Sequence, residues 1–237
     1  MFVENKELFH FNDSEKRKDI WKVGNQIDTT QNYVADFWNG GIYFSGKVNV
    51  DDGEMLPFFN VINRYLEEDQ DKETYIKLLE ETSRLLKCYS ILQRELVLEE
   101  VRKRFYPQIQ SRKNALYLCD YNQIEYWKNI LTIPGKNIDL FKVEVTGELF
   151  KSSDILLPDN SESINTMFEQ SKKYWEADLT NIPDEATEYL FRGKVKILEK
   201  IWVKELLKKN KKIWYYEYER RKLHKIKKDT FDWSNQM

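Results

Sequence analysis

The sequence predicts an α+β fold, in which strands from distant parts of the chain form a central or split sheet beside helices. Short stretches of alternating or continuous apolar residues, typical of strands, occur at 7–11, 115–119, 138–145 and 185–199. Apolar spacing becomes helical between residues 55 and 105, and basic and aromatic residues dominate beyond residue 201. These changes predict one domain over residues 1–201, with a helical insertion at 55–105, and a basic aromatic helix and tail at 202–237.

The composition indicates a compact protein of the cytoplasm. A chain of 237 residues can bury a large core, and the eight glycines and five prolines are too few for a linker-rich or disordered protein. Cys88 and Cys119 lie among apolar residues without a CxxC spacing, which indicates reduced thiols. No apolar run has the length of a signal peptide or of a membrane-spanning helix. We therefore expect a cytoplasmic location and no membrane partner.

Residues 7–11, ELFHF, predict the first strand, followed by the breaker residues 12–14. His10 faces away from Phe9 and Phe11, so it either points into the core with a hydrogen-bond partner or lines a pocket. The usual zinc spacings of His and Cys are absent, so we expect no metal site. The polar and aromatic stretch at 21–49, with turns at Gly24 and Gly40–Gly41, either covers a ligand or is an ordinary loop anchored by aromatic side chains.

Residues 55–105 predict two or more amphipathic helices with a charge-rich break at 67–73. Pro107 ends the last of them near Tyr106. The apolar positions of the second helix include Leu79, Leu85, Leu86, Tyr89, Leu92 and Leu96.

Strands and helices then alternate. Residues 115–119 predict a second strand, and Asp120 begins a helix that ends before Pro134. Residues 138–145 predict a third strand, and a turn at Thr146–Gly147 leads to 148–150, either a continuation or a hairpin partner. The next helix, at 161–175, is capped by Ser161 or Ser163.

Residues 185–199, EATEYLFRGKVKILE, predict a hairpin with one buried face and a turn at Arg192–Gly193. Its apolar positions alternate at Tyr189, Phe191, Val195 and Ile197. Glu188 stands at the mouth of the first strand, one residue before this run. Its carboxylate either projects from a rigid edge into a cleft, where it can act on a substrate, or lies in solvent as most glutamates do.

The segment 204–228 carries eleven basic and three acidic residues, a local charge of +8. Its aromatic residues, Trp214, Tyr215, Tyr216 and Tyr218, either stack on nucleic-acid bases or pack back onto the domain. The sequence contains no P-loop, dinucleotide fingerprint, HExxH or GxSxG motif.

Three short pieces resemble, in their order and spacing, the strand-borne motifs of the ADP-ribosyltransferase superfamily in the His-Tyr-Glu variant of its diphtheria-toxin branch. They are LFHF with His10, SRKNALYLCDY with Tyr117, and ATEYLFRGKV with Glu188. The last piece also resembles bacterial DNA-modifying members, in which a Glu precedes a short apolar strand and a Gly. The resemblance covers a few dozen residues and implies a split mixed sheet around an NAD cleft, to which this chain adds the helical insertion and the basic C-terminal helix.

The resemblance also implies roles for these residues. His10 would hold the ribose or carboxamide of NAD, Tyr117 would stack on the nicotinamide, and Glu188 would bind the ribose 2′-hydroxyl and stabilise the oxocarbenium ion. ADP-ribose would pass to a macromolecular acceptor, with nucleic acid, contacted through residues 204–228, as one candidate. The second tyrosine of the family corresponds to Tyr121 or Tyr126. Ala186 stands where the family often has Gln or Glu, which argues against protein arginine as the acceptor.

Elementary chemistry agrees with these roles. Cleavage of the glycosidic C–N bond builds positive charge on the ribose, and a fixed carboxylate in a water-poor cleft stabilises that charge. Arg112, just before the second strand, either binds the NAD pyrophosphate through its planar guanidinium or is an exposed loop arginine. The competing hypothesis is a non-enzymatic binding module of the same fold, which acts on nucleic acid or a partner protein through the basic segment or the helical insertion.

Overall fold

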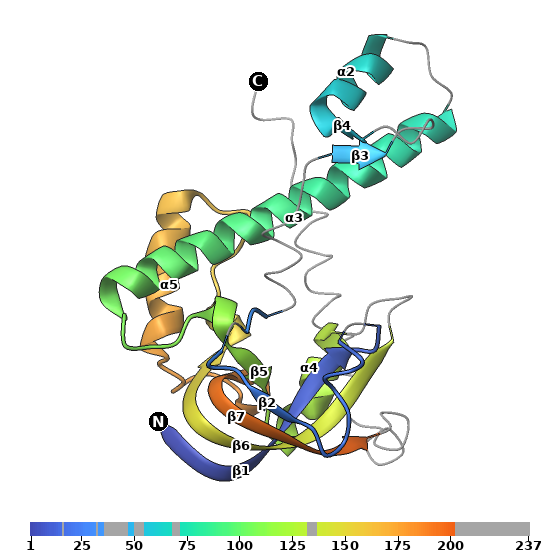
Figure 1. Ribbon diagram of the computed structural model, residues 1–237. Coiled ribbons are helices and arrows are strands. Elements are labelled where there is room, and N and C mark those ends of the chain that lie inside the picture. The colour runs from blue at the N-terminus through green and yellow to red at the C-terminus, as the bar shows by residue number, and fades with distance from the viewer. Residues whose placement is uncertain are drawn as a thin grey trace.

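The structure, a computed structural model, describes residues 1–15, 17–31, 33–35, 47–49, 55–67, 72–131 and 137–201 (Figure 1). Several predicted features lie outside these residues: the turn at Gly40–Gly41, most of the break at 67–73, and the basic helix and tail at 202–237 with its segment 204–228.

Five antiparallel strands form the main sheet. They are β1 (Phe2–Asp13), β2 (Gln26–Asp28), β5 (Leu116–Leu118), β6 (Ile138–Ser153) and β7 (Thr187–Ile201). β6 lies between β1 and β7, and the other edge of β7 pairs first with β5 and then with β2. Two backbone hydrogen bonds of 2.9 Å between Phe9 and Cys119 tie β5 to β1, so the bent sheet brings these two strands together. The predicted α+β class is confirmed, whereas the predicted mixed sheet is wrong, because every pairing of the described strands is antiparallel.

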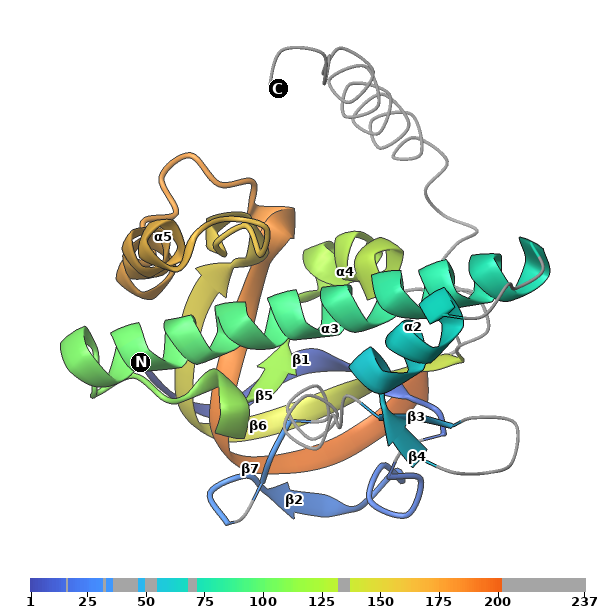
Figure 2. The same ribbon diagram turned by 90° about the horizontal axis from the view of Figure 1, so that it is seen from above.

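β6 and β7 are each one continuous strand, so the two predicted turns are wrong, and of the two alternatives for residues 148–150 the continuation is confirmed. Thr146–Gly147 and Arg192–Gly193 lie in the middle of these strands, and Gly147 pairs directly with Gly193. A Cβ on Gly193 would lie 2.4 Å from the Thr146 carbonyl oxygen, and a Cβ on Gly147 would lie 2.4 Å from that of Arg192. Neither position tolerates a side chain without movement of the backbone. The strands bend strongly along their length in both views (Figures 1 and 2).

The helices occur where the sequence predicts them. They are α2 (Phe58–Glu67), α3 (Lys72–Phe105), α4 (Ile124–Leu131) and α5 (Ile164–Glu176). α3 ends two residues before Pro107, and the side chain of Ser163 caps α5 by accepting a hydrogen bond from Thr166 N. Short 3₁₀ helices occur at Arg112–Asn114, Tyr121–Gln123, Asp154–Leu156 and Asp184–Ala186. A separate two-stranded sheet, β3 (Lys47–Asn49) with β4 (Met55–Pro57), lies beside α2.

The long helix α3 crosses one side of the main sheet, with α5 beside its C-terminal half (Figures 1 and 2). Its buried positions are Leu85, Glu95, Leu98 and Val101. Leu79, Leu86 and Leu96 are exposed, so the buried stripe is narrower than the apolar spacing predicts.

The sheet has apolar packing on two sides. Tyr189, Phe191, Val195 and Ile197, the predicted buried face of β7, lie in one core with Leu8 and Trp21. Leu190, on the opposite face of β7, packs with α3 and α5. Glu188 and Leu190 are two residues apart on the strand, so their side chains leave the same face of the sheet. Glu188 therefore faces α3 and α5.

Candidate functional site

A cavity of about 620 Å³ lies between β1, β5, the beginning of β7, α3 and α4. All four predicted site residues, His10, Arg112, Tyr117 and Glu188, line it. Its wall also includes Tyr33, Arg94, Glu95, Trp127 and Asp154, together with apolar residues of β1 and α4. The fold thus brings together side chains that are far apart in the sequence.

The backbone next to Glu188 is held firmly at the start of β7. Trp127 Nε1 donates a hydrogen bond of 2.8 Å to the Thr187 carbonyl oxygen, and Gln123 Nε2 donates one to Thr187 Oγ1. Ser153 Oγ donates to the carbonyl oxygen of Ala186 at 2.7 Å. Glu188 is only 5% exposed, so the alternative of a solvated residue at the strand entry is wrong.

Arg112 joins Glu188 to a second buried carboxylate. Its Nη1 lies 2.8 Å from Glu188 Oε1, and its Nε lies 2.9 Å from Glu95 Oε2. Tyr174 Oη from α5 donates a hydrogen bond of 2.7 Å to Glu188 Oε1 and accepts one from Arg112 Nη1. Arg112 is 6% exposed, so the alternative of an exposed loop arginine is also wrong.

Local structure places Arg112 in this position. Ser111 accepts a hydrogen bond from Lys113 N and so caps the short 3₁₀ helix that contains Arg112. Ser111 Oγ also donates to Glu99 Oε2 of α3 at 2.8 Å. The SRKN motif therefore turns the chain against α3 before β5 begins.

Four charged groups alternate in sign along this side of the cavity. Arg94 Nη2 lies 3.1 Å from Glu95 Oε1, and the ion pairs continue through Arg112 to Glu188. The formal charges of these four groups sum to zero. Both hydrogen bonds to Glu188 use Oε1, and among the described residues none is made to Oε2. Oε2 is therefore the carboxylate oxygen that remains for a ligand.

Burial and neighbouring charges fix the protonation of Arg112 and Tyr174. Burial alone would lower the pKa of Arg112, but the surrounding carboxylates, above all Glu95, raise it well above its ordinary value. Burial raises the pKa of Tyr174 well above its ordinary value, although the charge of Arg112 opposes this. Arg112 thus stays charged and Tyr174 stays a hydrogen-bond donor to Glu188 over the physiological pH range.

His10 is a neutral imidazole in the cavity wall. Burial lowers its pKa to about 4, against the effect of its hydrogen bond to Tyr117. His10 Nδ1 lies 2.9 Å from the Tyr117 carbonyl oxygen, which can only accept, so Nδ1 carries the proton and Nε2 is an acceptor. The ring stacks on Trp21 with centroids 4.2 Å apart. His10 thus has a buried hydrogen-bond partner, as the first alternative predicts, and also lines a pocket, as the second predicts.

Tyr117 lies on β5 opposite Leu190 of β7. Its hydroxyl donates a hydrogen bond of 3.2 Å to the Arg112 carbonyl oxygen, and the Arg112 guanidinium lies 5.2 Å from its ring centroid. Burial raises the pKa of Tyr117, which keeps it protonated. Neither candidate for a second tyrosine lines the cavity: Tyr121 is exposed and packs against Phe9, and Tyr126 donates to Asp154.

Three residues of the charged and hydrogen-bonded network around Glu188 were not predicted: Arg94, Glu95 and Tyr174. Glu95 carried a signal, because it lies three residues before Leu98 and six before Val101, in the buried stripe of α3. An acidic residue in such a stripe requires a buried partner. Arg94 and Tyr174 carried no comparable signal, since arginine and tyrosine occur commonly at helix surfaces and boundaries.

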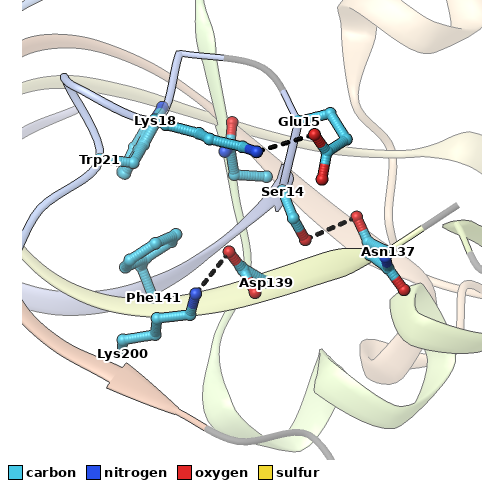
Figure 3. Close-up of a pocket in the computed structure, with 9 residues that line it drawn as sticks. Ser14, Glu15, Lys18, Trp21, Asn137, Asp139, Phe141 and Lys200 are labelled. Carbon is cyan, nitrogen blue, oxygen red and sulfur yellow. Dashed lines mark hydrogen bonds and ion pairs between the residues drawn. The ribbon is translucent and has the colours of Figure 1, made fainter.

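A second cavity, of about 430 Å³, lies near the C-terminal end of β1 (Figure 3) and has Asn12 in common with the first. Its charged side chains pair with one another: Lys18 with Glu15 and Lys200 with Asp139, each at 2.7 Å. Trp21 and Phe141, which form its aromatic side, are buried in the core. Of the predicted site residues none lines this cavity, so the larger one is the candidate site.

The described residues contain no group of three or more His, Cys, Asp or Glu side chains placed to hold a metal ion. None of their helices is both long and apolar enough to cross a membrane. Cys88 and Cys119 are free thiols, and burial raises the pKa of Cys119 to about 12. Cys119 is therefore a protonated thiol and a poor nucleophile.

Comparison with known proteins yields a family and no curated relative. No curated protein matches the chain. One family model matches residues 8–203. This range contains every described strand and helix except the first six residues of β1. The chain therefore belongs to the family described as "Protein of unknown function (DUF2441)".

Proposed function

We propose that this protein is an ADP-ribosyltransferase that cleaves the bond between nicotinamide and ribose of NAD in the larger cavity. One observation carries the proposal: His10, Tyr117, Arg112 and Glu188, drawn from three separate parts of the chain, line a single cavity of about 620 Å³. Ligand sites of this kind usually measure about 300–1,000 Å³ and combine apolar walls with a few polar groups. The order of the three sequence motifs supports the same reaction.

Glu188 is the catalytic residue of the proposal. Arg112 and Tyr174 both hold its Oε1, so the carboxylate has one orientation and Oε2 faces the ligand. When nicotinamide leaves with the electron pair of the C–N bond, the ribose carbon becomes cationic. A fixed carboxylate in a site from which water is excluded stabilises this cation more than it stabilises the bound substrate.

His10 and Tyr117 bind and orient the substrate. The neutral His10 offers Nε2 as an acceptor, which suits a ribose hydroxyl or the carboxamide N–H. Tyr117 offers an aromatic ring at the same wall, which suits stacking on the nicotinamide. Arg112 takes a positioning role, because its charge is already shared between Glu95 and Glu188. This role replaces the predicted contact with the NAD pyrophosphate.

In the transfer step an acceptor nucleophile forms a bond to the same ribose carbon and loses its proton to solvent or a base. We expect the acceptor to be macromolecular, with nucleic acid as the favoured class because of the basic segment 204–228. The cytoplasm remains the expected location, in keeping with the two free cysteines.

The test is the release of nicotinamide from NAD by the full-length protein. We expect Glu188→Gln to lower this rate by about 100- to 1,000-fold, because it removes the charge that stabilises the oxocarbenium ion. The variant should still fold, since Arg112 keeps its ion pair with Glu95. Glu185→Gln is the matched control, because Glu185 is exposed three residues away, and it should retain full activity. Equal rates for the unaltered protein and Glu188→Gln would remove Glu188 from the mechanism.

A further inference from the structure

Arg94 is an arginine of the cavity with an unused hydrogen-bond donor. It lies on α3, lines the same cavity as Glu188, and its side chain is 20% exposed. Its Nε is the one buried side-chain nitrogen or oxygen without a hydrogen-bond partner among the described residues. A buried donor of a charged group without a partner is costly, so a small movement of this side chain that gives Nε an acceptor on a ligand would be favourable.

The position of Arg94 within the alternating charges gives the cavity polarity. Arg94 stands at the positive end of the row that continues through Glu95 and Arg112, and Glu188 stands at the negative end. Such a site suits a ligand that carries a cation at one end and an anion at the other. The planar guanidinium of arginine favours phosphate and carboxylate groups, which accept two parallel hydrogen bonds from it.

We propose that Arg94 is the phosphate-binding residue of this cavity and holds the pyrophosphate of a nucleotide ligand. The inference rests on the proposed function, because that reaction supplies a ligand with a cationic nicotinamide ring and an anionic pyrophosphate. It moves the phosphate contact from Arg112, whose charge is shared by two carboxylates, to Arg94, the other arginine of the row. Arg94 and Glu188 then bind opposite ends of the same dinucleotide.

Carboxylates beside Arg94 and elsewhere in the cavity wall affect the strength of this contact. Glu95 accepts one of its hydrogen bonds, and Asp154 lines the cavity while accepting a hydrogen bond from Tyr126. The charge of Arg94 also contributes, after the hydrogen bonds from Ser161, to the lowered pKa of Asp159. These carboxylates repel a bound phosphate, so its affinity depends strongly on the positive charge of Arg94.

The experiment compares a ligand with phosphates and one without, by calorimetric titration of the full-length protein. ADP-ribose is the first probe and nicotinamide riboside the second. Arg94→Gln should weaken ADP-ribose binding by about 10- to 100-fold and leave nicotinamide riboside binding within about twofold. The affinity of Arg94→Lys for ADP-ribose should lie between that of the unaltered protein and that of Arg94→Gln, because lysine keeps the charge and loses the planar pair of donors. Arg104→Gln, an exposed arginine of the same helix, is the matched control and should bind both probes normally.

Each outcome either supports or overturns phosphate binding by Arg94, and the results distinguish this role from the cleavage of NAD. Unchanged binding of the riboside also shows that the variant is folded at the cavity. If Arg94→Gln binds ADP-ribose as tightly as Arg104→Gln, Arg94 is not the phosphate ligand, whatever the protein does with NAD. If ADP-ribose binds through Arg94 while NAD is not cleaved, the inference holds and the proposed reaction fails. If the unaltered protein binds neither probe, both fail.

Discussion

The central arrangement at the scale of single residues is an arginine between two buried carboxylates. Arg112 contacts Glu95 on α3 and Glu188 on β7, which are 1% and 5% exposed. A buried ion pair adds little net stability compared with an apolar pair, but loss of one partner leaves an uncompensated charge. Here loss of the arginine would leave Glu188 without a cationic partner and Glu95 with Arg94 alone.

This predicts a large effect of Arg112→Gln on stability. The free energy of unfolding, measured by chemical denaturation at pH 7, should fall by about 3–5 kcal/mol. Adding Glu95→Gln should recover part of the loss, because it removes the repulsion between two buried carboxylates that Arg112 no longer separates. If the double variant is less stable than Arg112→Gln alone, Glu95 does not repel Glu188 in the absence of the arginine.

His10 predicts a dependence of stability on pH. Its pKa is about 4 in the folded protein and about 6.5 for an ordinary histidine, so between these values the unfolded chain binds one more proton than the folded protein. Acid therefore destabilises the fold in this window. We expect the unaltered protein to lose about 2–3 kcal/mol more than His10→Gln between pH 6.5 and pH 4. Parallel pH profiles for the two proteins would show that His10 titrates normally.

Sequence alone indicated the three site residues on strands. His10, Tyr117 and Glu188 each stand out as a polar group in or beside a short apolar run, and their order resembles a known set of motifs. The partners that orient Glu188 come from α3 and α5, and only the fold brings these helices to the start of β7. The ion pairs of Arg112 could not be predicted either, because they depend on Glu95 being buried.

At the scale of elements, the sheet is built around two facing glycines. Gly147 and Gly193 have φ angles of +157° and +156° and pair across β6 and β7. From the sequence each glycine indicated a turn, since a glycine between two short apolar runs commonly marks a hairpin. The two strands instead continue through the glycines, which allow the backbones to approach closely where the sheet bends. Such a pair is recognisable only once the register of the two strands is known.

We predict that Gly193→Ala destabilises the protein by about 2–4 kcal/mol. The new Cβ would lie 2.4 Å from the Thr146 carbonyl oxygen and 2.8 Å from Phe191 Cζ, so the backbone or the core must shift. Gly24→Ala is the matched control: Gly24 also has a positive φ, of +90°, but no atom lies within 4 Å of its added Cβ. It should cost only the backbone strain, about 1–2 kcal/mol. Equal losses in thermal or chemical unfolding would show that crowding at Gly193 is relieved at no cost.

At the scale of the whole molecule, the fold explains why residues from β1, α3, β5, α5 and β7 meet. The antiparallel sheet bends until β5 contacts β1, and α3 and α5 cover the face from which Glu188 points. The sequence predicted the class of fold and the helices, because helical spacing and caps are local signals. Strand pairing and the bend of the sheet depend on contacts between distant residues, and these had no local signal.

The basic segment 204–228 predicts a second property of the full chain, binding of nucleic acid. Its affinity for duplex DNA, measured by fluorescence anisotropy, should fall steeply as salt rises, because each phosphate contact releases bound counterions. A chain ending at residue 203 should bind more weakly and with a shallower salt dependence. The same salt dependence in both chains would place the contacts in the main domain.

The most direct test of the central claim is a crystal of the Glu188→Gln variant soaked with NAD, which that variant should bind but not cleave. We predict NAD in the cavity of about 620 Å³, with its nicotinamide ribose beside position 188 and its pyrophosphate beside Arg94. A saturated crystal with NAD bound elsewhere, or with protein side chains occupying this cavity, would contradict the account.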